Sequence, residues 1–364
     1  MGKVTLQDVA KAAGVSIATA SWAVNDNKNV RIPEATRRKV RKVADRLGYH
    51  SNALARGLAR GLARGRSDLI GFVSDGVATS PFAGQVIQGA QDEAWRNGKI
   101  LLVVDTDGNP TIERKAFAFM LEHQVEGVIY SSWVHRSIVP PAELDRITSV
   151  LVNCFDEQGR FPAVVPNELQ GGRTATQLLI DAGHRRIAFV NDPPISPASV
   201  GRLAGYRQAL EESGIEYDPR LVIAAGADQE GGYGAAGAVL ASGATAVFCY
   251  NDRASMGLYD ALRERGLRVP DDLSVVGFDN QEVISAHLHP ALTTVGLPQY
   301  DLGVLGVRAL LALQEPGADR VGDDAAAGMP DTVGMPGVAE PAGPPYAPLL
   351  VACPTVTRDS IKPR

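Results

Sequence analysis

The chain of 364 residues contains few cysteines and no long apolar run. Its cysteines, Cys154, Cys249 and Cys353, are far apart and odd in number, so neither a disulfide framework nor a metal site is indicated, and we expect buried structural thiols. No stretch reaches the roughly 18 uncharged apolar residues of a membrane-spanning helix, and residues 1–5 lack the apolar core of a secretory signal. We therefore expect a soluble, cytoplasmic protein with no membrane partner.

Common catalytic and cofactor-binding motifs are also missing. The sequence has no GxSxG elbow, no P-loop, no GxGxxG after its first expected strand and no HExxH. We therefore expect no enzyme activity, no catalytic residue and no cofactor, although an α/β enzyme with an unrecognised site stays an alternative. With 45% apolar and 21% charged residues the composition is globular, and at about 100–200 residues per domain the length predicts two or three domains.

Charge is divided unevenly along the chain. Residues 1–66 hold fourteen Lys or Arg and four Asp or Glu, a balance of +10, whereas the remainder holds 22 and 37, a balance of −15. A basic head of this kind can lie along a polyanion and release counterions, while the acidic body would be repelled. A solvated basic face is the alternative that charge alone leaves open.

The beginning of the head predicts two short helices joined by a tight turn. Thr5 and Asp8 are placed to cap the first helix, Gly14 supplies a left-handed stop, and Ser16 caps a second helix, Ile17–Val24. This arrangement is a helix-turn-helix. The apolar stripe of the first helix consists of Leu6, Val9, Ala10 and Ala13.

A third helix, Pro33–Leu47, completes a small all-α head, because Pro33 suits a first helical turn. Its expected inward residues are Val40, Val43, Ala44 and Leu47. Its largely outward residues are Arg37, Arg38, Lys39, Arg41 and Lys42.

Three segments of the head, Val4–Val24, Leu47-Gly48-Tyr49 and Asn52-Ala53-Leu54-Ala55-Arg56, resemble the lac repressor/galactose repressor family of bacterial transcription regulators. The resemblance implies a helix-turn-helix domain at residues 1–50, whose second helix enters the major groove of each half of a pseudo-palindromic DNA operator. The base-facing candidates are Ile17, Ala18, Ser21 and Trp22. The candidates for phosphate contacts are Thr5, Ser16, Thr19 and Asn25.

The second helix departs from the family pattern, which usually has a polar residue where Trp22 stands and often one at Ile17. Ile17, Ala18 and Trp22 cannot form bidentate hydrogen bonds with guanine or adenine, so apolar contact with thymine methyls is what they can offer. Trp22 packed against the third helix is the structural alternative. The operator sequence of other members therefore does not transfer.

Residues 54–65 repeat LARG three times. The leucines follow one helical face, but each glycine costs about 1 kcal/mol relative to alanine in a helix, so the segment needs a second copy and DNA to fold. The resemblance implies a hinge at 51–66 whose leucine wedges into the minor groove. Leu58 matches that wedge by its distance from Tyr49, Leu62 is the alternative leucine, and a flexible linker is the alternative structure.

From Leu69 onward, apolar runs alternate with amphipathic stretches, which predicts parallel, doubly wound sheets covered by helices and divided between two lobes. The expected strands are Leu69–Ser74, Ile100–Asp105, Gly127–Ser131, Val150–Phe155, Ile187–Asn191, Leu221–Ala225, Ala246–Tyr250, Ser274–Phe278 and Leu349–Val351. Expected helices include Phe82–Arg96, Glu168–Ala182, Arg202–Ser213 and Asp252–Arg265.

Polar residues collect where these strands end. Ligands of parallel α/β sheets bind outside the carboxyl ends of the strands, so facing lobes would turn these side chains toward a shared cleft. Any one of them is more often a helix cap, but the set favours a site for a hydroxyl-rich ligand. The strand ends are Ser74-Asp75, Asp105-Thr106-Asp107, Ser131-Ser132, Asn191-Asp192, Asn251-Asp252 and Asp279-Asn280.

The body continues the resemblance, which implies a two-lobed effector-binding and dimerisation domain at 67–364 with a periplasmic-binding-protein-like fold. The segments that carry it are Pro81-Phe82, Val165-Pro166-Asn167 with Gly171-Gly172, Gly183-His184-Arg185-Arg186-Ile187-Ala188, Gly201-Arg202-Leu203-Ala204-Gly205-Tyr206, Gly277-Phe278-Asp279-Asn280 and Thr357-Arg358-Asp359-Ser360. By this comparison Arg202 grips the effector, and Asp279 accepts hydrogen bonds from it. Phe82 and Asp252 line the cleft.

Two positions weaken inference about the effector. Pro166 stands where the family commonly has Asp, and Ala227 where many members place a stacking aromatic residue, so Trp133 is the substitute ring we consider. We interpret His184 as structural. Residues 315–348 are rich in Gly, Pro and Ala with little periodicity, which predicts a disordered or loosely packed loop without an assigned function.

Together these features predict a sequence-specific DNA-binding regulator, a repressor by preference, whose operator affinity is controlled by a small-molecule effector. A sugar or sugar derivative is the effector we expect, and a homodimer or higher oligomer is the expected assembly. A solute-binding protein without a role on DNA is the alternative that the body alone would allow.

Overall fold

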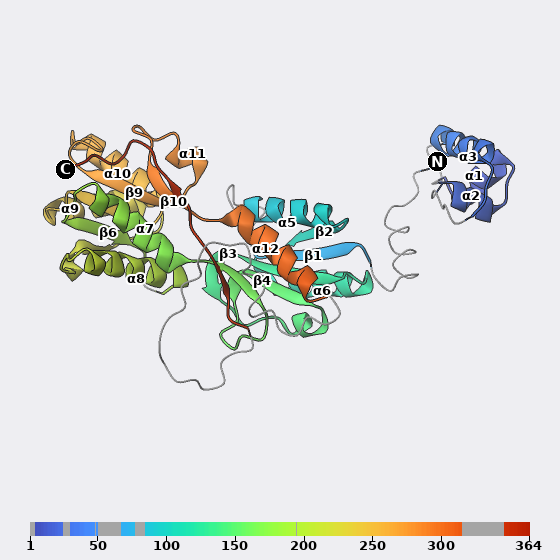
Figure 1. Ribbon diagram of the computed structural model, residues 1–364, viewed down its shortest axis with the longest axis horizontal. Helices are drawn as coiled ribbons and strands as arrows, with labels where there is room; N and C mark the ends of the chain where they lie inside the picture. Colours follow the sequence, from blue (N-terminus) through green and yellow to red (C-terminus); the bar gives the residue numbers. More distant parts are fainter. Residues whose placement is uncertain are drawn as a thin grey trace. The chain divides into compact units, whose positions relative to one another are not determined.

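The computed structural model describes residues 4–24, 30–47, 49, 67–76, 84–193, 195–314 and 346–364. The chain divides into two compact units, Met1–Asp68 and Leu69–Arg364 (Figure 1). Several features of the sequence prediction, including the whole hinge at 51–66, lie outside the described residues. Among them are Asn25, Leu58, Leu62, Phe82 and most of the 315–348 loop.

The first unit is the predicted three-helix head, made of α1 (Leu6–Ala13), α2 (Ile17–Val24) and α3 (Glu34–Leu47). Thr5 and Asp8 form the expected capping box, and Gly14 ends α1 at a φ of 67°. The core consists almost entirely of small side chains, which lets three short helices approach closely. Its buried members are Val9, Ala10, Ala13, Ala20, Ala23, Val40, Val43 and Ala44.

The prediction for Arg37 was wrong, because this residue lies inside the head and not on its surface. It falls on the same helical stripe as Val40 and Ala44, three and seven positions away. Its guanidinium donates to the backbone oxygens of Val30, at 3.0 Å, and Trp22, at 3.5 Å. The arginine thus satisfies a carbonyl that the end of α2 leaves without an intrahelical partner.

The second unit contains two six-stranded sheets, as the alternating pattern predicted. The first sheet has the order β11-β5-β4-β3-β1-β2, and the second has the order β12-β10-β9-β8-β6-β7. All pairs are parallel except β10 with β12. The first sheet contains β1 (Leu69–Ser74), β2 (Ile100–Asp105), β3 (Gly127–Ser137), β4 (Ser149–Phe155), β5 (Ala163–Pro166) and β11 (Leu349–Val351). The second contains β6 (Ile187–Asn191), β7 (Val222–Ala224), β8 (Ala246–Cys249), β9 (Ser274–Asp279), β10 (Thr293–Gly296) and β12 (Thr355–Val356).

Helices cover both sheets (Figure 1). The first lobe carries α5 (Gly84–Arg96), α6 (Pro110–Glu122), α12 (Gln299–Ala312) and the short η1 (Ala142–Arg146). The second carries α7 (Glu168–Asp181), α8 (Pro197–Glu212), α9 (Gln229–Ala241), α10 (Asp252–Glu264), η2 (Pro219–Leu221) and α11 (Glu282–Ser285). The start of α8 lies five residues before the predicted Arg202, because Ser196 caps the helix and Pro197 occupies its first turn. No described helix combines the length and apolar character needed to cross a membrane.

The chain crosses between the lobes three times, from β5 to α7, from β10 to α12 and from β11 to β12. Two of these crossings leave the carboxyl end of a strand and enter the amino end of a helix in the other lobe. In α/β folds a helix begins at the edge where the strands end. The carboxyl edges of the two sheets are therefore turned toward each other, and both lobes contribute to whatever is bound there.

Close helix packing brings two side chains of this region together. A Cβ atom at Gly172 on α7 or at Gly205 on α8 would overlap the backbone of the facing helix, so only glycine permits this approach. At Gly201 the same atom would lie 2.7 Å from the Cβ of Glu168. This packing seats Arg202 of α8 beside Glu168, the first residue of α7.

Candidate functional site

One face of α2 in the head is exposed and apolar. Ala20 and Ala23 are buried against the other helices, while Ile17 is 50% exposed and Trp22 is 38% exposed. Trp22 is not among the residues of the buried core of the head. Ala18 also lies on the surface. The exposed face therefore offers the apolar contact surface expected of a helix that reads thymine methyl groups.

Hydroxyl groups mark the amino ends of α1 and α2. Thr5 donates its hydroxyl to Asp8 at 2.7 Å, and this hydrogen bond lowers the pKa of the Asp8 carboxyl. Ser16 accepts from the backbone N–H of Thr19 at 3.1 Å, and their hydroxyls lie 2.8 Å apart. The helix ends are exposed, where N–H groups and the helix dipole favour an anion. The exposed cations of α3 are Arg38, Lys39, Arg41, Lys42 and Arg46.

Arg202 lies at the centre of the polar cluster in the body. It is 3% exposed, and its guanidinium is stacked on Phe278, 3.7 Å from the ring centroid, and on Tyr250, at 4.5 Å. Its Nε donates to Glu168 at 2.8 Å, and its Nη1 donates to the backbone oxygen of Tyr250 at 2.5 Å. Burial disfavours the charged guanidinium and would lower the pKa of Arg202. The negative charges of Glu168 and Asp279 have a larger effect in the opposite direction, so the pKa of Arg202 is raised.

Glu168 joins the two lobes. One carboxylate oxygen accepts from Arg202, and the other lies 3.3 Å from Nδ1 of His135, which belongs to β3 of the first lobe. Burial alone would raise the pKa of Glu168, but the charges of Arg202 and His135 and the hydrogen bonds from both outweigh it and lower the pKa. The carboxylate is therefore held ionised between a cation of one lobe and an imidazole of the other.

Asp279 stands where β9 ends, with its φ in the left-handed region at 97°. One carboxylate oxygen lies 3.6 Å from Nη2 of Arg202, and the other accepts from the side chain of Gln281 at 3.0 Å. Burial raises the pKa of Asp279 to about 6, and Arg202 acts in the opposite direction. Near neutral pH this carboxylate is an acceptor for a ligand's hydroxyl groups.

Asp252 does not have the position that we expected. The side chain is buried, with no exposed surface, and accepts hydrogen bonds from the backbone N–H of Gln281, at 2.6 Å, and the hydroxyl of Thr294, at 2.7 Å. Burial raises its pKa well above the usual range, with Asp279 adding to the effect. In this structure the Asp252 carboxylate holds the loop after β9 through its hydrogen bond with Gln281. The residue begins α10 and is fully buried, so it does not line an open surface.

The first lobe supplies a second polar group around Asp75. Its carboxylate accepts from the hydroxyl of Ser132 at 3.0 Å and the backbone N–H of Trp133 at 2.8 Å, and it forms an ion pair with Arg136. The indole of Trp133 is 37% exposed. The end of β3 thus holds an accessible ring beside a neutralised carboxylate.

Several buried polar atoms along the carboxyl edges have no hydrogen-bond partner among the described residues. Such atoms are costly in a folded protein unless a ligand or water satisfies them. Ser74 and Ser131 are directly paired neighbours on β1 and β3. The unpartnered atoms at these edges are Ser74 Oγ, Ser131 Oγ, His135 Nε2, Asn191 Oδ1 and Arg253 Nε. Hydroxyl, amide and imidazole groups of this kind suit a ligand that both donates and accepts hydrogen bonds.

Sequence reasoning missed Glu168, His135 and Arg253. Glu168 was read only as the start of a helix, and His135 lies in the part of β3 that extends beyond the predicted strand. No spacing rule links them, because the contact joins residues 33 positions apart in different lobes. Arg253 directly follows the predicted Asn251-Asp252 pair, so its position was the one available signal.

Other candidate groups have structural surroundings. His184 is buried, with Nδ1 2.9 Å from the hydroxyl of Thr245 and Nε2 3.2 Å from the backbone oxygen of Lys362, in agreement with the structural interpretation. The three cysteines are free and buried, as predicted, and burial raises the thiol pKa of each. No cluster of metal-ligating side chains occurs within the described ranges.

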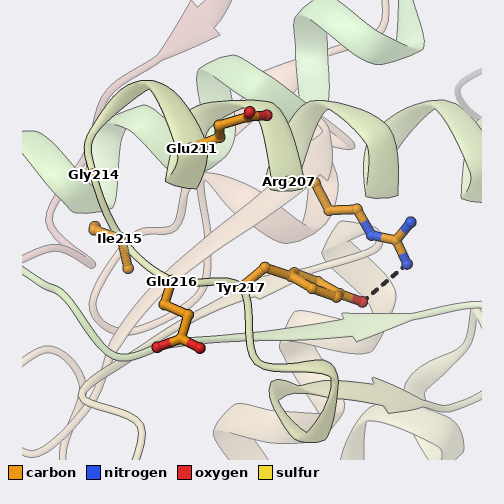
Figure 2. Close-up of a pocket in the computed structure, with 6 residues that line it drawn as sticks. All are labelled: Arg207, Glu211, Gly214, Ile215, Glu216 and Tyr217. Atoms are coloured by element: carbon orange, nitrogen blue, oxygen red, sulfur yellow. Dashed lines mark hydrogen bonds between the residues drawn. The ribbon is translucent and has the colours of Figure 1, made fainter.

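A shallow groove lies at the end of α8 (Figure 2). It is lined by Arg207, Glu211, Gly214, Ile215, Glu216 and Tyr217. The segment after α8 leads into η2 and the beginning of β7, so the groove lies at the edge where the strands begin. It is therefore separate from the polar cluster at the carboxyl edges.

Two family descriptions match the chain. Residues 5–52 match "Bacterial regulatory proteins, lacI family", and residues 176–326 match "Periplasmic binding protein-like domain". The first match covers the head and the second covers much of the second lobe with α12. The first match contains the exposed α2, and the second contains Arg202 and Asp279 of the polar cluster.

Several known proteins resemble the chain over most of its length. The transcriptional regulator DegA of Bacillus subtilis (strain 168) is 33% identical over 306 residues, covering 83% of this chain and 88% of DegA. The transcriptional regulator GalR of Escherichia coli (strain K12) is 33% identical over 319 residues, covering 85% and 89%. A lac repressor dimer bound to operator and the anti-inducer ONPF has a TM-score of 0.73 at 25% identity, covering 99% of this chain and 100% of that one. A regulator from Rhizobium etli has a TM-score of 0.65 at 30% identity, covering 82% and 100%.

Proposed function

Because the chain belongs to the lacI family of bacterial regulatory proteins, we propose how its own residues bind an operator and an effector. Membership confirms the resemblance predicted from the sequence. The chain is a DNA-binding transcriptional repressor that responds to a small molecule, and its relatives are regulators and not enzymes. A regulator that reads a bacterial operator works beside the chromosome, so we place the protein in the cytoplasm.

The observation that carries the proposal is the exposed apolar face of α2 on a strongly basic head. Ile17, Ala18 and Trp22 contact base edges through thymine methyl groups, with Ser21 beside them on the same helix. The phosphate contacts come from Thr5, Ser16, Thr19 and Asn25. We propose the hinge at 51–66 as the minor-groove element, with Leu58 or Leu62 as its wedge.

The effector binds between the lobes, at the carboxyl edges of the two sheets. Arg202 and Asp279 form the polar floor on the second lobe, and Trp133 supplies an exposed ring from the first. Phe82 is retained from the resemblance as a further contact. The unpartnered serine and asparagine atoms at the same edges favour a hydroxyl-rich effector, a sugar or a sugar derivative.

An exposed edge of the first lobe supports the proposal of a homodimer. The strand β2 is the last strand of its sheet, and edge strands are normally covered or charged. Instead, Ile100 and Val103 are exposed on β2, and Trp95 is exposed on α5 beside it. We propose that a second copy covers this surface. Ultracentrifugation of the Trp95→Asp variant checks it, because a charge at this position should shift the protein toward monomer.

Coupling between the two sites then rests on lobe closure. An effector that prefers one closure state changes how the paired bodies hold the two hinges, and so changes operator affinity by its differential affinity, typically about 1–3 kcal/mol. The sign, induction or corepression, depends on which closure state the effector prefers.

A gel-shift experiment tests the proposal. Full-length protein should bind a specific operator duplex, and the affinity should fall by about 10³–10⁵ between 50 and 200 mM salt if six to ten phosphates are contacted. Ile17→Asp and Trp22→Asp should each remove the preference for the operator over random duplex. Absence of specific binding at low salt would refute the proposal.

A further inference from the structure

Glu168 is the group most directly paired with the arginine of the cleft, although neither the sequence motifs nor the comparisons assign it a role. Its Oε2 accepts from Nε of Arg202 at 2.8 Å, and the two side chains are 4% and 3% exposed. A bond of this length between fully formed charges is among the stronger polar contacts in proteins. The carboxylate belongs to the first turn of α7, which packs closely against α8.

Each of the three guanidinium nitrogens of Arg202 lies against a polar group of the protein. Nε faces Glu168, Nη1 donates to the backbone oxygen of Tyr250, and Nη2 lies 3.6 Å from Asp279. The rings of Phe278 and Tyr250 cover the guanidinium plane. Glu168 and Asp279 already compensate the charge of this cation, so a ligand anion would compete with two buried carboxylates for it, and a buried charge left unpaired is strongly unfavourable.

The charge around the cluster is also unfavourable for a second anion. Three carboxylates, those of Glu168, Asp279 and Asp192, interact with Arg202, and the other cations nearby are Arg253 and Arg358. In the first lobe Asp75 is already neutralised by Arg136. The atoms left without partners at the strand ends are mostly neutral donors and acceptors.

We infer that Glu168 is a specificity-determining residue, an internal carboxylate that occupies Arg202 and restricts the cleft to neutral, hydroxyl-rich effectors. Phosphorylated sugars and sugar acids are excluded, because their anion would compete with Glu168 for the same guanidinium. His135 reinforces the restriction, since its Nδ1 lies 3.3 Å from the second oxygen of Glu168 and holds the carboxylate from the opposite lobe. The inference rests on the proposed function, since it names the effector class of that cleft.

Arg253 is the residue that challenges this inference. Its Nε is buried without a partner, so it offers a second place for an anion. Asp279 lies close enough for Arg253 to lower its pKa, and that carboxylate competes with any incoming anion. The experiment below therefore includes an Arg253→Gln variant.

The test uses the full chain and two probes, inorganic phosphate and sulfate, with chloride at equal ionic strength as the reference. Phosphate and sulfate stabilise many proteins without binding to a specific site. The quantity to compare is therefore the rise in Tm that each anion causes in each variant, relative to the rise in the wild type. Glu168→Gln removes the carboxylate that is paired with Arg202. The Tm of this variant should rise with phosphate by about 2 °C or more beyond the rise in the wild type, and the rise should saturate with phosphate concentration. Glu93→Gln is the matched control: Glu93 is equally buried and pairs with Arg308 at 3.0 Å and Arg96 at 2.8 Å, away from the cleft. It should match the wild type.

Two results overturn the inference. One is a Glu168→Gln protein that folds, by circular dichroism, and gains no more from phosphate than the wild type. The other is a wild type that saturates with phosphate and loses this response in Arg253→Gln, which would assign anion binding to Arg253.

If Glu168→Gln does not fold, a wild-type screen decides. Glucose and galactose are compared with glucose 6-phosphate, galactose 1-phosphate and the corresponding sugar acids, and an anionic form that raises Tm more than its neutral parent overturns the inference. A larger rise with the neutral parent supports it. Operator binding is measured separately by gel shift, so a failure of the inference leaves the regulator function standing, and loss of operator binding refutes that function alone.

Discussion

The head and the body use opposite surfaces for binding. In the head the core is made of alanine and valine, and the candidate contacts, such as Ile17 and Trp22, are exposed. In the body the candidate contacts, such as Arg202 and Glu168, are almost completely buried at the ends of strands. The difference follows from the ligands: a duplex is read from outside by a protruding helix, whereas a small molecule is enclosed.

Removal of residues 1–66 should have the largest effect, because it eliminates one of the two binding surfaces. Without α2 and the basic residues, we expect loss of all specific operator binding, which in such proteins is typically about 10³–10⁷ tighter than non-specific binding. The body has its own sheets and core, so its thermal transition should be unchanged. Gel shift and calorimetry measure the two results. Retained operator specificity would show that the body, and not the head, reads DNA.

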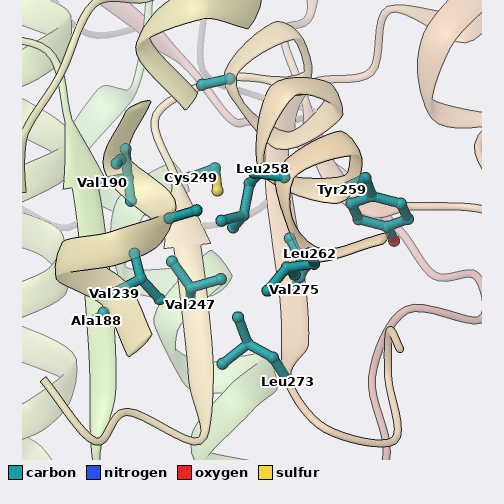
Figure 3. Close-up of a cluster of buried hydrophobic side chains, with 14 of the residues drawn as sticks. Ala188, Val190, Val239, Val247, Cys249, Leu258, Tyr259, Leu262, Leu273 and Val275 are labelled. Carbon is teal, nitrogen blue, oxygen red and sulfur yellow. The ribbon is translucent and has the colours of Figure 1, made fainter. Parts of the chain in front are cut away.

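Leu258→Ala should give the largest effect on stability. Leu258 on α10 belongs to the same buried cluster as Val190, Val247 and Val275 (Figure 3). Its truncation leaves a cavity and should lower the free energy of unfolding of the body by about 2–5 kcal/mol. In the head, Val40→Ala removes less volume and should cost about 1–2 kcal/mol. Calorimetry should resolve two transitions and assign each change to its own unit; a single shared transition would contradict independent units.

The three helices of the head could be predicted from local signals in its sequence. The capping pair Thr5 and Asp8, the stop at Gly14 and the apolar stripes fixed three helices, because each of these signals is local. The exposed face of α2 then followed from the positions left outside the stripe. The surface position predicted for Arg37 was wrong, because its place on the helical stripe with Val40 and Ala44 determines its burial more than its charge does.

In the body the sequence predicted the sheets and two members of the polar cluster, Arg202 and Asp279, but not the contacts that complete it. Alternating apolar runs identified the lobes and the strand ends, including Asp279. The contacts that complete the cluster depend on tertiary packing: Glu168 meets Arg202 through a glycine contact between helices, and meets His135 across the lobes. Asp252 was placed on the cleft surface by analogy, and its burial under the loop after β9 depends on a hydrogen bond to Thr294, 42 positions away.

Arg37→Met tests the difference between a buried and an exposed arginine of the same helix, α3. The substitution keeps an apolar stem but leaves the carbonyls of Val30 and Trp22 without their donor, so the head should lose about 1–3 kcal/mol of stability. Arg38→Met is the matched control, because Arg38 is the exposed neighbour, and it should change stability by less than about 0.5 kcal/mol. Thermal unfolding of the head transition measures both. Equal effects would show that burial of Arg37 contributes nothing.

The smallest expected effect is a pH dependence that belongs to the body alone. His184 is buried, and its Nε2 donates to the backbone oxygen of Lys362, since a carbonyl can only accept. Burial lowers the pKa of His184 below its usual 6.5, so the folded state favours the neutral ring. As the pH falls below 6.5, the unfolded chain takes up a proton that the folded protein resists, and the body loses stability until the pH passes the folded pKa.

The Tm of the body transition should therefore decrease more steeply between about pH 7 and 5.5 in the wild type than in His184→Asn, which removes the titrating ring. Asp279 acts in the opposite direction over part of this range, because burial raises its pKa to about 6, so the difference between the two proteins is the quantity to compare. His287→Asn, at an exposed position, should retain the wild-type slope. Equal slopes in the wild type and His184→Asn would mean that this histidine is protonated as readily inside the fold as outside it. The contacts with Thr245 and Lys362 would then adapt to the charge.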